Sequence, residues 1–148
     1  MKLSEHFTLA ECTKTQVRLP NQPPAEVIEN MRAVCEHILE PVREHFGRPV
    51  VINSFFRSLG VNRAIKSKDN SQHVKGEAVD FEVPGIPNAE VAEWVRDNLT
   101  FDQCILEFYR PGEPSSGWVH VSLKMDVTAC RAQCLTINEG GTFQGLHA

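Results

Sequence analysis

The sequence predicts a single α+β domain in which helices pack on one face of a mainly antiparallel sheet. Apolar residues recur at helical spacing over residues 25–46 and 89–99, which indicates two amphipathic helices. Short alternating or apolar segments, which are typical of strands, lie at residues 49–54, 77–83, 103–109 and 118–123. With 148 residues, the chain can bury one independent core but does not fit a second folded domain.

The first half of the chain is predicted to be mainly helical. Residues 3–13 form a short helical lead-in, for which Thr8 is a suitable N-cap. The long helix over residues 25–46 contains Pro41, and we expect it to bend or end early there because proline removes a backbone hydrogen bond. The apolar run at residues 49–54 then predicts a buried strand.

The second half is predicted to supply most of the sheet. A short helix is expected at residues 61–66, and Asn88 is a good N-cap for the helix at 89–99. The loop at residues 110–117 contains two prolines and two glycines, so it can return the chain antiparallel to the strand before it. In that earlier strand, alternation places three residues on one side, namely Ile105, Glu107 and Tyr109.

The domain is expected to cover residues 1–124, with residues 125–148 as a C-terminal extension. In this extension, residues 134–137 predict an edge strand. The glycine-rich residues 138–145 predict a flexible tail.

The side chains that could bind a metal lie in the segment from Ser71 to Asp80 and in the strand that contains His120. Alternation places Asp80 on the face of its strand opposite to the apolar residues, and His120 in the same way on its own strand. The two side chains can therefore share a surface. His73 lies in the loop before the first of these strands, where Gly76 permits a tight bend that returns the imidazole over the sheet.

Two imidazoles and one carboxylate form a ligand set that suits a divalent zinc ion when a fourth position is left to water. A single histidine or aspartate on a strand is more often a structural residue than a ligand. The combination of His73, Asp80 and His120 on separate segments favours a shared metal site, and hence a metal-dependent hydrolase.

The pattern Ser-x-His-x-x-Gly-x-Ala-x-Asp at residues 71–80, followed by Trp-Val-His-Val-Ser at 118–122, resembles a known family. It is similar to the zinc D-Ala-D-Ala carboxypeptidases and the phage L-alanyl-D-glutamate endopeptidases, which share a fold with the hedgehog signalling domain. Residues 54–58 also resemble the Ser-Gly-Tyr-Arg-Ser segment of that family, and residues 70–73 its zinc loop. The resemblance covers residues 3–124.

This resemblance implies that His73, Asp80 and His120 are zinc ligands. It also implies that Arg57 contacts the substrate, with Ser71 and Gln72 beside it, and that the substrate is a peptidoglycan stem peptide. A planar guanidinium such as that of Arg57 matches a carboxylate or a developing oxyanion, although a surface salt bridge is the simpler structural role. The motif leaves open whether a terminal D-Ala is removed or an internal L-Ala-D-Glu bond is cut.

Hydrolysis of an amide also requires a base that takes a proton from water and delivers it to the leaving amine. Many members of the family carry an acidic residue three positions before the last histidine, but here that residue is Gly117. Glu107 is our candidate for this role, with Glu113 and Asp102 as weaker options. A structural ion pair between Glu107 and Arg57 or Arg110 is the alternative.

The composition of the chain limits its possible binding partners and its cellular location. The net charge of −4 provides no basic patch for nucleic acid, and no apolar run is long enough to span a membrane. Five cysteines, an odd number, favour reduced thiols over a disulfide framework, and Cys130 and Cys134 lack zinc-ribbon spacing. We expect a monomer that is made in the cytoplasm without a signal peptide and meets the cell wall through lysis, as a phage or prophage endolysin does.

A second hypothesis has the same fold with a structural zinc. In that case the protein is a non-catalytic module that binds a cell-wall peptide or a protein partner. The absence of an acid at Gly117 favours this hypothesis.

Overall fold

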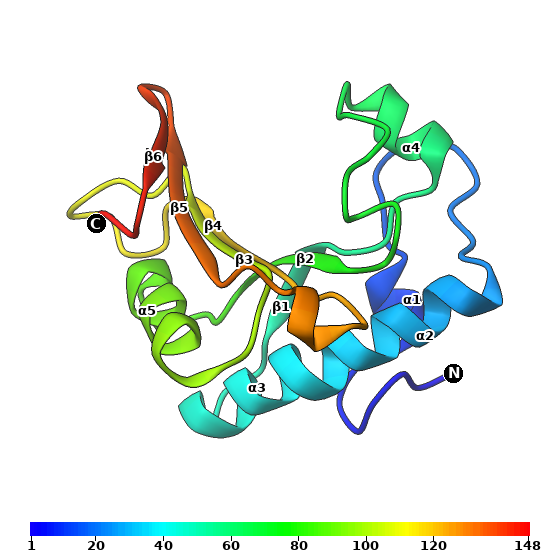
Figure 1. Ribbon diagram of the computed structural model, residues 1–148, viewed down its shortest axis with the longest axis horizontal. Coiled ribbons are helices and arrows are strands. Elements are labelled where there is room, and N and C mark those ends of the chain that lie inside the picture. Colours follow the sequence, from blue (N-terminus) through cyan, green and yellow to red (C-terminus); the bar gives the residue numbers. More distant parts are fainter.

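A six-stranded sheet forms the centre of the structure, a computed structural model that describes residues 1–148 (Figure 1). The strand order is β1-β2-β4-β3-β5-β6, and every neighbouring pair is antiparallel except β3 and β5. The prediction of an α+β fold with a mainly antiparallel sheet is confirmed. The strands are β1 (Val51–Ser54), β2 (Ala78–Glu82), β3 (Gln103–Glu107), β4 (Trp118–Ser122), β5 (Gln133–Asn138) and β6 (Gly141–Gln144).

Helices α2, α3 and α5 cover one face of this sheet (Figure 1). Apolar side chains of these helices and of β2, β3 and β4 form the core between the two layers. No helix is both long enough and apolar enough to cross a membrane. The helices are α1 (Leu9–Cys12), α2 (Ala25–Val34), a π-helical turn η1 (Cys35–Leu39), α3 (Glu40–Phe46), α4 (Leu59–Ala64), α5 (Asn88–Asn98) and a 3₁₀ turn η2 (Val127–Ala129).

Pro41 does not end the long helix early, and a local change of register accommodates it. The helix continues from α2 through η1 into α3, and the Glu40 N–H donates to the carbonyl of Cys35, five residues earlier. Pro41 follows in the first turn of α3. Proline has no backbone N–H to donate, and this position after the π-helical turn tolerates that loss. Helix α3 ends at Gly47, which has a left-handed φ of 63°.

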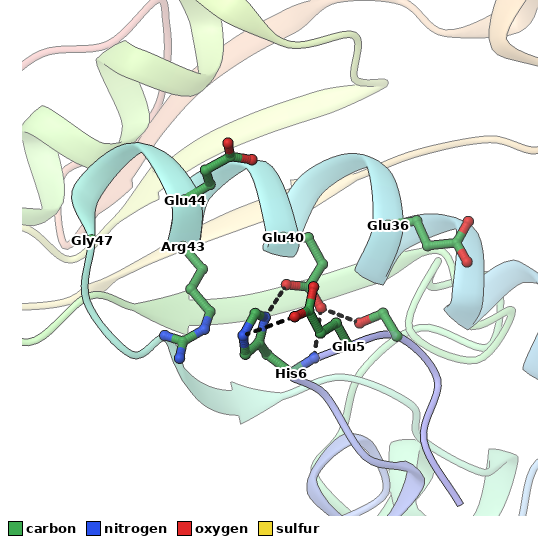
Figure 2. A pocket seen from close by; sticks show the side chains of 8 residues that line it. Glu5, His6, Glu36, Glu40, Arg43, Glu44 and Gly47 are labelled. Carbon is green, nitrogen blue, oxygen red and sulfur yellow. Dashed lines mark hydrogen bonds and ion pairs between the residues drawn. The ribbon is translucent and has the colours of Figure 1, made fainter.

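The N-terminal segment is attached to α3 through the carboxylate of Glu40 (Figure 2). Glu40 Oε2 accepts hydrogen bonds from Ser4 Oγ at 2.6 Å and from the backbone N–H of His6 at 2.8 Å. Thr8 caps α1, as the sequence predicts. A polar cavity of about 690 Å³ lies here, and none of the residues predicted for the functional site lines it.

Two local predictions need correction. β1 is not a buried strand but lies at the edge of the sheet, where Val51 is 43% exposed. Pro87, not Asn88, precedes α5 as its N-cap. The amide of Asn88 instead donates to Glu82 Oε1 and to two carbonyls before β4, so it supports the loop rather than the helix.

The C-terminal segment is part of the sheet. β5 lies between β3 and β6, so it is an internal strand and not the edge strand that the sequence predicts. Residues 141–144 form β6, and the prediction of a flexible tail over 138–145 is therefore wrong for them. The domain boundary at residue 124 stays a prediction.

Candidate metal centre

Asp80 and His120 come together because of the register of two neighbouring strands. They are direct partners across the antiparallel pair of β2 and β4. Their neighbours Phe81 and Val119 point into the core, so both polar side chains project from the opposite face. This is the arrangement that the alternation predicts.

His73 reaches the same place from the loop before β2, and Gly76 makes this possible. Gly76 has a φ of +70°, and a Cβ atom there would lie 2.7 Å from Val27 Cγ1 and 2.8 Å from Met31 Cγ of α2. A glycine is required because the loop packs directly on the helix. The His73 ring is consequently buried beside the sheet.

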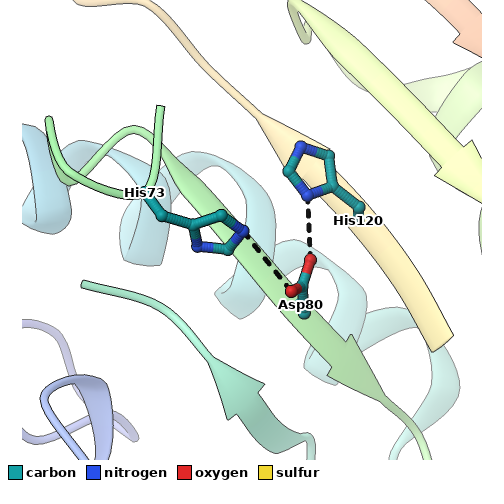
Figure 3. Close-up of side chains that lie close together, drawn as sticks. All are labelled: His73, Asp80 and His120. Carbon is teal, nitrogen blue, oxygen red and sulfur yellow. Dashed lines mark hydrogen bonds and ion pairs between the residues drawn. The ribbon is translucent and has the colours of Figure 1, made fainter. Parts of the chain in front are cut away.

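The three side chains face one another (Figure 3). His73 Nε2 lies 3.4 Å from Asp80 Oδ2, and His120 Nδ1 lies 2.8 Å from Asp80 Oδ1. One potential ligand atom from each residue lies within 4.8 Å of the others. The structure thus brings together all three residues that the sequence predicts as metal ligands.

The hydrogen bonds of the centre fit a cation between these atoms. His73 Nδ1 lies 2.7 Å from the carbonyl oxygen of Phe55, which can only accept, so Nδ1 carries the proton. In the neutral imidazole, Nε2 then directs a lone pair toward the Asp80 carboxylate. Two electron-pair donors face each other in a buried site, which suits a divalent metal ion.

Arg57 lies next to this centre and is held by three groups. Its Nε donates to Ser54 Oγ at 3.0 Å, and its two terminal nitrogens lie 3.4 Å from Asn62 Oδ1 and from Asp80 Oδ2. Asn62 is fully buried and also donates to the carbonyl of Lys68 at 2.7 Å. Sequence reasoning missed Asn62, because an asparagine within a short helix carries no signal of its own.

Glu107, at the end of β3, is the only one of the three candidate bases at the centre. Its Oε1 lies 3.9 Å from His120 Nδ1. Burial, together with the negative charge of Asp80, raises the pKa of Glu107 to about 7. Glu113 instead pairs with Arg110 in an exposed loop, and Asp102 pairs with Arg131. No ion pair joins Glu107 to Arg57 or Arg110, so the structural alternative finds no support.

The structure explains why Gly117 cannot be replaced by an acid. A Cβ atom at Gly117 would lie 2.0 Å from the carbonyl oxygen of Glu107 and 2.6 Å from the carbonyl carbon of Phe108. Gly117 also has a φ of +65°. The close approach of β3 and β4 therefore excludes any side chain here, and the carboxylate beside His120 comes from Glu107 instead.

Ser71 and Gln72 support the loop of His73. Ser71 Oγ accepts from the backbone N–H of His73 at 3.3 Å, and Gln72 Nε2 donates to Glu77 Oε1 at 3.4 Å. Both side chains are half-buried. Their role in substrate binding stays a prediction.

An α+β sheet that carries two histidines and an aspartate beside a separate glutamate is typical of metal-dependent hydrolases. The sequence model of the family Peptidase M15 matches residues 5–122, and the chain belongs to this family. This confirms the resemblance to the D-Ala-D-Ala carboxypeptidase group that the motifs indicate. A search of curated proteins finds no match.

Proposed function

We propose that the protein is a zinc-dependent metallopeptidase that hydrolyses a peptide bond in peptidoglycan stem peptides. The observation that carries the proposal is the convergence of His73, Asp80 and His120 on one buried point of the sheet. Membership of the Peptidase M15 family supports a peptidase. The choice of peptidoglycan rests on the resemblance of the motifs.

His73 Nε2, an Asp80 carboxylate oxygen and His120 Nδ1 are the atoms that would hold the ion. Zinc, when bound, polarises the scissile carbonyl and lowers the pKa of a bound water. The hydrogen bond between His73 Nδ1 and the Phe55 carbonyl orients this ring for its task.

Glu107 serves as the general base and acid. Its carboxylate takes a proton from the attacking water and delivers it to the nitrogen of the leaving amine. A group with this task needs to lie near the ligands without being one of them, and Oε1 of Glu107 lies 3.9 Å from His120 Nδ1.

Arg57 binds the substrate carboxylate or stabilises the tetrahedral intermediate. A guanidinium has five N–H donors, and the contacts with Ser54, Asn62 and Asp80 use three of them. Two donors therefore stay free for the substrate.

Metal analysis combined with a digestion assay tests the proposal. We expect about one zinc ion per chain and the appearance of new amino groups when the purified protein digests peptidoglycan. A chelator should stop this release, and added zinc should restore it. The H120A variant should lose zinc and activity, whereas H45A, a change at an α3 histidine stacked on Trp94, should keep both. Absence of zinc, or release that continues in the chelator, overturns the proposal.

The identity of the cleaved peptide bond, and the way in which the enzyme reaches the cell wall, rest on the resemblance alone. The sizes of the released fragments distinguish removal of a terminal D-Ala from cleavage of an L-Ala-D-Glu bond. For the setting, we propose a monomeric enzyme that meets the wall at lysis, as an endolysin does. Failure to lyse walls added from outside would contradict this setting without affecting the chemistry.

The competing hypothesis is a non-catalytic module with a structural zinc. The sequence feature in favour of this hypothesis is the absence of an acid at Gly117. The position of Glu107 beside His120 weakens that argument. Binding of peptidoglycan with bound zinc but without new amino groups would support this alternative.

A further inference from the structure

Two of the cysteines, Cys104 of β3 and Cys134 of β5, are direct neighbours in the sheet. They are partners in the parallel register of the two strands. Neighbouring strands lie about 4.8 Å apart, and a disulfide usually joins residues whose Cα atoms are about 4.4–6.8 Å apart. Because partners in register point to the same face of a sheet, the two sulfur atoms can be joined without a large movement of the backbone.

The two thiols differ in their access to solvent. Cys104 is fully buried between the sheet and α5, where its Sγ lies 3.6 Å from the carbonyl oxygen of Ala92. Cys134 is half-buried at the border of the core, and the strand beside it, β6, has only exposed side chains. A reagent from solvent therefore meets Cys134 first, and the thiol of Cys104 lies directly behind it.

The surroundings of the pair favour the thiolate of Cys134. Arg96 lies one turn after Ala92 on α5, so the same face of this helix covers both cysteines. A hydrogen bond from the Cys104 thiol and the positive charge of Arg96 outweigh partial burial and the charge of Asp97, and they lower the pKa of Cys134 to about 7. The thiolate is the form of cysteine that reacts with oxidants.

The other three cysteines lack this combination of a neighbouring thiol and access to solvent. Cys12 and Cys35 lie close together, but both are fully buried. The hydrogen bond between them, together with burial, raises the pKa of the Cys12 thiol. Cys130 is half-buried and lies outside the paired strands.

We propose that Cys134 is a site of oxidation by peroxides and that Cys104 converts the oxidised form into a reversible disulfide. The Cys134 thiolate attacks one oxygen of hydrogen peroxide, the O–O bond breaks, and hydroxide leaves with the electron pair and takes up a proton. The sulfur of Cys104 then attacks the sulfenic acid of Cys134, and the Cys104 proton leaves with the hydroxide as water. Two thiols are oxidised, and one peroxide is reduced to two water molecules.

The disulfide would join β3 covalently to the C-terminal segment of the sheet. It closes the part of the chain between residues 104 and 134, so we expect it to raise the melting temperature by about 5–10 °C. Cys104 packs in the core, on the face of the sheet opposite to the metal centre. Oxidation should therefore change stability without blocking that centre, and this inference is independent of the proposed function.

Mass spectrometry of the full chain after treatment with hydrogen peroxide provides the test. Once free thiols are alkylated, the wild type should carry two fewer alkyl groups than the reduced protein, and dithiothreitol before alkylation should restore both. Trypsin cuts after Arg131 and so separates Cys130 from Cys134. The linked peptides should contain Cys104 and Cys134. C130S is the matched control and should form the same link, whereas C134S should form none and should melt at the same temperature with or without peroxide.

A second variant separates the two steps. C104A leaves Cys134 without a partner, so a sulfenic acid should accumulate there and be trapped by dimedone added with the peroxide. If C104A does not fold, the peptides of the wild type and of C134S decide the matter alone. The proposal is overturned if all five thiols of the wild type remain open to alkylation, if the link contains Cys130, or if it joins two chains instead of one.

Discussion

Glu107 shows how the position of one residue determines its chemistry. It is an ordinary glutamate in sequence, but burial and the charge of Asp80 raise its pKa to about 7. A carboxyl group with a pKa close to neutral can both accept and donate a proton during turnover.

Replacement of Glu107 by glutamine should abolish hydrolysis while zinc stays bound. The amide has the same shape but cannot accept the proton, so we expect kcat to fall by about 10²–10⁴-fold. Steady-state kinetics and metal analysis of the same preparation measure this. E113Q is the matched control, because Glu113 pairs with Arg110 in an exposed loop. Retained turnover in E107Q would remove Glu107 from the mechanism.

Gly117 is a second residue whose importance is set by its surroundings. G117A should destabilise the protein by about 2–4 kcal/mol, because a methyl group would overlap the Glu107 backbone and the positive φ would be strained. Urea unfolding measures the difference. G112A is the matched control, since Gly112 has a φ of +85° but no atom within 4 Å of the place that a methyl group would take. Equal losses in the two variants would show that only the backbone strain matters.

At the scale of elements, the start of β3 is joined to the segment before β5 by Asp102. The Asp102 carboxylate is fully buried and accepts from Arg131 Nε at 3.0 Å and from a terminal nitrogen at 2.7 Å. Burial alone would raise the pKa of Asp102, but the bonds from Arg131 outweigh it and hold the pKa below its ordinary value.

D102N should lower the free energy of unfolding by about 1–3 kcal/mol at neutral pH. Because the folded pKa is depressed, the stabilisation is present above the unfolded value of about 3.9 and is lost as the pH falls through the lower folded value. The wild type and D102N should therefore converge in acid. Urea unfolding between neutral and acidic pH measures this, with D97N at an exposed ion pair as the control. A difference that is the same at every pH would contradict the assignment.

Element types followed from the sequence more reliably than their ends. Alternation placed β2 and β4 and the faces of Asp80 and His120, because side-chain direction in a strand depends only on its period. The cap of α5 was missed because the Asn88 amide is drawn to Glu82 and the loop before β4. The alternation predicted for β3 is wrong after Glu107. Phe108 has a φ of +54°, and Tyr109 packs against the core instead of lying on the side of Glu107. This was missed because the positive φ depends on contacts with Gly117 and Ile137.

On the scale of the whole molecule, the C-terminal segment completes the sheet. β5 pairs with β3 over five residue pairs, and Leu135 of β5 is buried opposite Ile105. Without residues 125–148, β3 would become an exposed edge strand and Asp102 would lose Arg131.

A chain of residues 1–124 should therefore melt at least about 10 °C below the full chain, or fail to unfold cooperatively. Thermal unfolding followed by circular dichroism measures this. A chain of residues 1–140 is the matched control, because it removes only β6 and the residues after it, and all β6 side chains are exposed. Identical melting of the 1–124 and full-length chains would instead support an independent domain that ends at residue 124.

The sequence by itself determined the fold class and the three metal-ligand candidates, and it left Glu107, Glu113 and Asp102 as candidate bases for the structure to separate. These follow from periodicity and residue chemistry, which are local properties of the chain. Only the tertiary structure decided why Gly117 bears no acid, how Asn62 holds Arg57, and that Cys134 lies beside Cys104. Each of these depends on atoms from distant segments that come within a few ångströms of one another, and such distances are set by packing rather than by sequence spacing.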